Sequence, residues 1–127
     1  MISFDYKEIK EKSYPATPVT LLSQDNRIEI YAIIDSGSEV SLFDKELAKR
    51  LGINYRLTKE IRDMTGVSGR LLVYVHQLNI SIGGRTVPRK IGVSDERTTS
   101  HNLLSRQGFF ENFKITFDET NHKIFLE

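Results

Sequence analysis

The 127-residue chain contains no cysteine. It therefore has no disulfide framework, no thiolate metal ligand and no cysteine nucleophile. An absence of cysteine fits a reducing compartment, and we expect a cytoplasmic protein.

Long apolar runs are absent as well. No stretch approaches the roughly 20 consecutive apolar residues that a membrane-spanning helix needs. The first 15 residues, MISFDYKEIKEKSYP, include three acidic residues and no apolar core of the kind found in signal peptides. We therefore expect a soluble protein with no membrane partner.

Neither sign of charge dominates the sequence. Lys and Arg total 18, Asp and Glu total 17, and the two signs are interspersed, so we expect no nucleic-acid partner. The three histidines, His76, His101 and His122, are far apart in the sequence and have no carboxylate at ligand spacing. We expect neither a metal site nor a cofactor.

The sequence does contain many short apolar or alternating runs separated by turn residues. Such runs predict strands, and the chain length suggests one domain, so we expect a mostly β barrel or sandwich with one or two short helices. Residues 18–127 form the predicted domain, and residues 1–17 an N-terminal segment that is either a dimer strand or a loose tail. The predicted strands cover residues 18–23, 27–34, 71–82, 86–88, 90–93, 102–104, 114–117 and 123–126.

Three local signals refine this picture. Asp44 is a predicted N-cap for a helix over 45–51, which Gly52 would end, and residues 107–113 suggest a second helical turn. Gly83-Gly84 predicts a hairpin turn. The apolar positions within 71–82 change phase midway, which suggests a bulge or bend.

The stretch IIDSGS places the carboxylate of Asp35 at the end of an apolar strand. Burying a carboxylate is costly unless it is hydrogen-bonded, and we expect the N–H groups of Gly37 and Ser38 to point at it. Ser36 adds a hydroxyl group. The tripeptide alone is more often an ordinary turn. Its context favours a functional site, because an apolar strand precedes it and a helix and a glycine-spaced tip at 64–69 follow.

These segments together resemble the retropepsin-like aspartic proteases, and in particular their cellular, non-viral members. IIDSGS is similar to the catalytic motif D-[ST]-G-[AS], and MTGVSG at 64–69 to the flap. NLLSR at 102–106 is similar to the second apolar segment, and GFFENFKITF at 108–117 to the ending of the cellular members. The resemblance extends from Pro18 to Glu127. It implies a closed, barrel-like β fold with one lobe per chain.

The resemblance also implies a homodimeric aspartic endopeptidase that acts on peptides or proteins and uses no cofactor. In this family, one carboxylate activates a water molecule and a second one donates a proton to the peptide carbonyl. The chain has a single D-S-G motif, so Asp35 would have to meet the partner subunit's Asp35 on a twofold axis. The substrate would be an extended peptide of apolar character.

The family suggests roles for further positions. Ser36 would bridge the two subunits, the Gly37 carbonyl would accept a hydrogen bond from the substrate, and Ser38 would support the turn. Glu39 and Arg106 are candidates for an ion pair near the dimer contact, the alternative being two independent surface charges. The final strand, 123–126, would offer an exposed edge to the partner. The predicted flap consists of Met64, Thr65, Gly66, Val67, Ser68 and Gly69.

Two departures from the family pattern keep other functions open. Ser105 stands where the family usually has glycine, and the flap has fewer glycines than viral members. One alternative is a catalytically weak or inactive module on the same fold, which binds peptides or dimerises. A remoter one is a nonenzymatic barrel that carries a D-S-G turn by chance.

Overall fold

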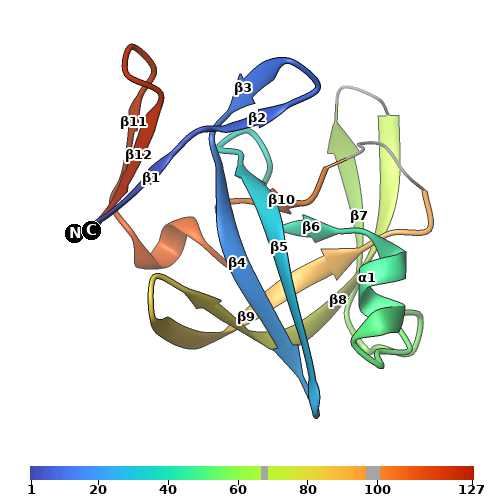
Figure 1. The fold of residues 1–127 in the computed structure, drawn as a ribbon. Coiled ribbons are helices and arrows are strands. Elements are labelled where there is room, and N and C mark those ends of the chain that lie inside the picture. Colours follow the sequence, from blue (N-terminus) through green and yellow to red (C-terminus); the bar gives the residue numbers. More distant parts are fainter. Residues whose placement is uncertain (67–68, 97–100) are drawn as a thin grey trace.

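The computed structural model describes residues 1–66, 69–96 and 101–127 as a mostly β structure (Figure 1). No helix in these ranges is long and apolar enough to cross a membrane. The helical segments are α1 (Lys45–Arg50) and the single 3₁₀ turn η1 (Phe110–Asn112). The strands are β1 (Ile2–Asp5), β2 (Lys7–Ile9), β3 (Lys12–Tyr14), β4 (Ala16–Ser23), β5 (Asn26–Ile34), β6 (Leu42–Phe43), β7 (Ile61–Gly66), β8 (Gly69–Ile82), β9 (Arg85–Val93), β10 (Leu103–Leu104), β11 (Ile115–Asp118) and β12 (Lys123–Leu126).

The pairing of the central strands forms a ring. β4 pairs with β5, and the sheet continues through β10, β6 and β9 to β8. β8 then pairs with β4, for example Ile80 opposite Leu21, and this pairing completes the ring. β7 lies outside the ring, and among the described residues it pairs only with the first part of β8. The predicted barrel-like β fold is confirmed.

The local signals at α1 and at the β8–β9 turn produce the predicted structure. Asp44 caps α1 by accepting a hydrogen bond from the Glu46 N–H at 3.0 Å. Gly52, with φ +76°, follows the last turn of the helix. Gly83 and Gly84 both have positive φ and join β8 to β9 in a two-residue hairpin turn.

Of the two causes suggested for the phase shift in β8, a bulge or a bend, the bulge is wrong. The register with β9 runs without interruption from Tyr74 opposite Val93 to Ile82 opposite Arg85. The phase shift has another cause, because the two halves of β8 bury opposite faces in two different cores. In the first half, Leu71, Val73 and Val75 pack in a small cluster with Leu42 and Met64. In the second half, Leu78, Ile80 and Ile82 pack in the main core.

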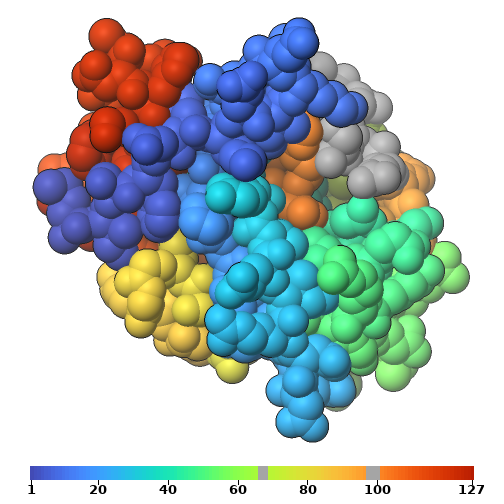
Figure 2. Space-filling model, viewed as in Figure 1, coloured from blue at the N-terminus to red at the C-terminus, as the bar shows by residue number. Residues whose placement is uncertain are grey.

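The two termini pair with each other. β1 pairs antiparallel with β12, for example Ile2 opposite Leu126, and the N- and C-terminal segments lie together on the surface (Figure 2). The start of the chain is therefore not a loose tail. β12 lies between β1 and β11, so the exposed edge predicted for residues 123–126 is wrong. The sequence pattern identified the strand but not its neighbours.

A glycine close to the candidate site provides a test of the packing. Gly108 has φ +91°, and a Cβ there would overlap the Lys90 carbonyl oxygen. Gly84 also has positive φ, +82°, but a Cβ there has nothing within 4 Å. We expect Gly108→Ala to lower the free energy of unfolding by about 2–3 kcal/mol, and Gly84→Ala by about 1 kcal/mol, in denaturant titrations. Equal losses would contradict the overlap at Gly108.

Candidate active site

Asp35 follows directly after β5, whose end lies between β4 and β10. The Ile34 N–H donates to the Pro15 carbonyl at 2.8 Å, and the Asp35 N–H donates to the Leu104 carbonyl at 2.9 Å. Both neighbouring segments thus fix the backbone at the point where the strand ends. The Asp35 side chain is half-buried, and Ser36 and Gly37 beside it are exposed.

The turn after Asp35 orients its carboxylate. The Gly37 N–H donates to Asp35 Oδ1 at 2.8 Å. A Cβ at Gly37 would lie only 3.2 Å from this oxygen, so glycine suits the close approach. Ser38 contributes through its side chain, because its hydroxyl donates to the Val40 carbonyl at 2.9 Å. The predicted N–H contact from Gly37 is therefore present, while the hydrogen bond seen for Ser38 stabilises the turn itself.

Backbone hydrogen bonds tie this turn to the segment after β10. The Arg106 N–H donates to the Ser38 carbonyl at 3.3 Å, and the Gln107 N–H donates to the Glu39 carbonyl at 2.7 Å. Ser41, which the sequence analysis did not identify, joins the same two segments. Its hydroxyl donates to the Gln107 carbonyl at 3.0 Å and accepts from the Ser105 N–H at 2.9 Å.

Ser105 is fully buried in this arrangement. Its Oγ has no hydrogen-bond partner within the described ranges. A buried hydroxyl without a partner costs free energy. The serine is therefore accommodated beside the Asp35 turn, but at a cost to stability.

The β7–β8 hairpin occupies the position of the predicted flap. Gly66 pairs with Gly69, Met64 packs on the small cluster of β8, and Thr65 is exposed. The predicted flap residues Val67 and Ser68 lie outside the described residues.

Glu39 and Arg106 do not pair with each other within the part of the chain that the structure describes. Glu39 Oε1 instead accepts a hydrogen bond from Gln107 Nε2 at 3.1 Å. The amide oxygen of Gln107 accepts from Arg62 on β7. Sequence reasoning missed Gln107 and Arg62, because neither residue belongs to a motif and they are far apart in the chain.

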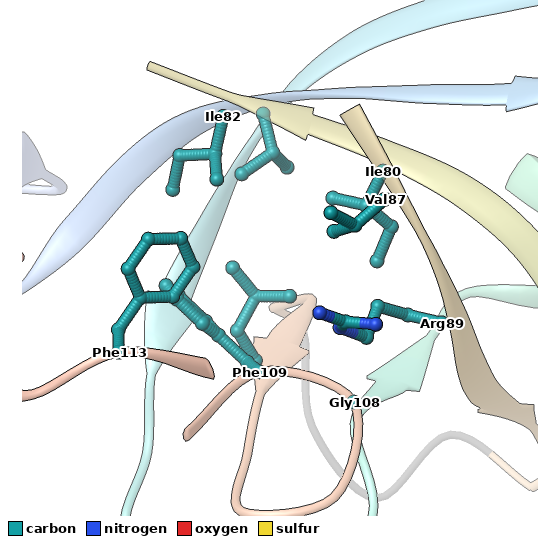
Figure 3. A pocket seen from close by; sticks show the side chains of 9 residues that line it. Ile80, Ile82, Val87, Arg89, Gly108, Phe109 and Phe113 are labelled. Carbon is teal, nitrogen blue, oxygen red and sulfur yellow. The ribbon is translucent and has the colours of Figure 1, made fainter. Parts of the chain in front are cut away.

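A small apolar pocket lies within the main core (Figure 3). One of its lining residues is Leu104, whose carbonyl holds the Asp35 backbone. About 10 Å³ is available to the centre of a water-sized sphere, which is near the minimum for one water molecule. We interpret the pocket as a gap in core packing. Its lining residues are Val19, Ile80, Ile82, Val87, Arg89, Leu104, Gly108, Phe109 and Phe113.

No group of three or more His, Asp or Glu side chains within the described ranges is placed to hold a metal ion.

Comparison with known proteins agrees with this geometry. A family model described as "Aspartyl protease" matches residues 18–107, which is most of the chain. This chain belongs to the aspartyl protease family. No curated protein sequence matches it.

Solved structures show that this family member has a retropepsin-like fold. A retropepsin-like aspartic protease from Rickettsia conorii is 18% identical, with 98% of each chain covered and a TM-score of 0.69. The retroviral protease-like domain of Ddi1 from Leishmania major is 21% identical over 90% of this chain and 88% of that chain, with a TM-score of 0.62. EIAV protease complexed with the inhibitor HBY-793 is 20% identical over 79% and 88% of the two chains, with a TM-score of 0.55.

Two buried serines of this family member should respond in opposite ways to the same substitution. We expect Ser105→Ala to raise the free energy of unfolding by about 1 kcal/mol, because it removes a buried hydroxyl that lacks a partner. Ser41→Ala should lower it by about 1–3 kcal/mol, because two hydrogen bonds are lost. Denaturant titrations of the two variants measure both effects. A loss of stability in Ser105→Ala would show that its hydroxyl has a stabilising partner.

Proposed function

We propose that this chain is a homodimeric aspartic endopeptidase in which Asp35 of each subunit forms one catalytic pair. The observation that carries the proposal is the Asp35 turn. A half-buried carboxylate, oriented by the Gly37 N–H at 2.8 Å, lies at the end of β5 with exposed residues beside it. The sequence has one such motif, so the second carboxylate has to come from another copy.

The proposed reaction is hydrolysis of a peptide bond by an activated water molecule. One carboxylate takes a proton from water, and the resulting oxygen nucleophile attacks the peptide carbonyl carbon. The other carboxyl group, which carries the proton shared by the pair, donates it to the carbonyl oxygen. The C–N bond then breaks as the amine takes the proton that came from water, a hydroxyl group of the tetrahedral intermediate returns its proton to the pair, and the pair again shares one proton.

The proposed substrate is an extended, apolar peptide that lies as a strand between the catalytic turn and the β7–β8 hairpin. The Gly37 carbonyl would accept a substrate N–H, and Ser36 would contact the other subunit. Exposure of both residues in the single chain is consistent with these roles. The Glu39–Arg106 ion pair does not form within the described part of the single chain, so it would have to form across the dimer contact.

The test is cleavage of a mixed peptide library between about pH 3 and 7, read by mass spectrometry. Asp35→Asn should abolish cleavage, because an amide cannot act as the general base. Asp25→Asn, in the exposed β4–β5 turn, provides a control for the loss of one carboxylate and should cleave like the wild type. Cleavage that survives in Asp35→Asn would contradict the proposal.

A second candidate function is a peptide-binding or dimerisation module that has lost proteolysis. Ser105 favours it, because this fully buried side chain stands beside the catalytic turn where the family usually has glycine. This candidate predicts a dimer that binds peptides, in both wild type and Asp35→Asn, and cleaves none. Sedimentation and peptide binding, measured on the same samples, distinguish it from the enzyme.

A further inference from the structure

Gln107 connects two charged side chains from different parts of the fold. Its amide oxygen accepts from Arg62 Nη1, and its amide nitrogen donates to Glu39 Oε1 at 3.1 Å. Arg62 lies near the base of the β7–β8 hairpin, and Glu39 lies in the turn that follows Asp35. A glutamine amide both accepts and donates, so it can satisfy a cation on one side and a carboxylate on the other.

Arg62 is itself held in place on its other side. Its Nη2 donates to Glu60 Oε2 at 2.6 Å, and Glu60 Oε1 accepts from Lys90 Nζ on β9 at 2.9 Å. These hydrogen bonds lower the pKa of Glu60, with that from Lys90 having the larger effect, and favour its charged form. The side chains of Arg62 and Glu60 are only 32% and 33% exposed, so solvent screens them less than fully exposed charges.

The β7–β8 hairpin depends on the Gln107 side chain more than the Asp35 turn does. β7 is the last strand of its sheet, and in the described ranges only β8 pairs with it. Backbone hydrogen bonds already hold the turn, from Arg106 to Ser38 and from Gln107 to Glu39. Loss of the Gln107 amide should therefore free the base of the hairpin and leave the Asp35 turn in place.

We propose that Gln107 is a positioning residue that sets the spacing between the β7–β8 hairpin and the turn that carries Asp35. This inference rests on the proposed function, in which the hairpin covers the bound peptide. A hairpin released at its base binds the peptide more weakly, while the carboxylate keeps its geometry. Loss of the connection thus raises KM and changes kcat little.

A pair of substitutions separates positioning from a general structural effect. Gln107→Glu keeps the shape of the side chain, but it places a second carboxylate against Glu39, and the repulsion displaces the side chain that holds Arg62. Adding Glu39→Gln removes the repulsion, because the new amide at position 39 can donate an N–H to the carboxylate at position 107. We expect Gln107→Glu to raise KM about tenfold with kcat within about twofold of wild type, and the double variant to return KM to within about twofold. Gln77→Glu, at an exposed glutamine of β8, is the control for the added charge.

Amide hydrogen exchange along β7 tests the same inference without any proteolysis. Exchange should be faster in Gln107→Glu than in the wild type and Gln77→Glu, and it should slow again in the double variant. Gln107→Leu, which removes both bonds and adds no charge, takes the place of Gln107→Glu if that protein does not fold. A wild type that cleaves nothing would count against the proposed function, while exchange would still decide the role of Gln107. Unchanged exchange, or a double variant as impaired as Gln107→Glu, would overturn the inference.

Discussion

The hydrogen bond from the Gly37 amide to Asp35 Oδ1 fixes a carboxylate at the end of a paired strand. A carboxylate that loses contact with water needs such a donor, and a two-residue turn supplies it at little steric cost only if glycine is present. β5 brings Asp35 to this point because it pairs with β4 on one side and β10 on the other. The short β10 strand is thus essential to the geometry, although it contains only two residues.

Residues 105–107 support the part of the Asp35 turn that follows the carboxylate. Backbone bonds and the Ser41 hydroxyl connect that segment to residues 38–41. The side chain of Gln107 extends the connection to the β7–β8 hairpin. One short segment therefore contacts both parts of the molecule that are proposed to hold a peptide. Ser105 is the first residue of this segment, and its buried hydroxyl adds a cost to stability.

Features that depend on neighbours in the sequence were predictable. The Asp44 cap, the Gly83-Gly84 turn and the Asp35 turn each follow from a few adjacent residues, and all three are present. The family resemblance supplied the closed β fold, which periodicity alone left as a barrel or a sandwich. Features that depend on distant pairing were not predictable. The pattern of residues 123–126 identifies a strand, but nothing in it shows that β1 occupies one edge.

The phase shift in β8 and the role of Gln107 illustrate the same limit. A change of apolar phase has two physical causes, a bulge or a change of core, and the sequence does not separate them. The structure separates them, because the register between β8 and β9 is uninterrupted and leaves no room for a bulge. Glu39 was predicted to form an ion pair with Arg106, but within the described chain it accepts a hydrogen bond from the neutral amide of Gln107. A glutamine carries no charge pattern that could have identified it.

The central claim is that two copies of Asp35 form one catalytic site, and mixing subunits tests it most directly. Wild-type and Asp35→Asn chains would be unfolded together, refolded at a fixed total concentration, and assayed for peptide cleavage. If each site needs both carboxylates, activity falls with the square of the wild-type fraction, to about one quarter when half the chains are wild type. Activity that falls in direct proportion to the wild-type fraction would mean that one Asp35 suffices, and it would contradict the account.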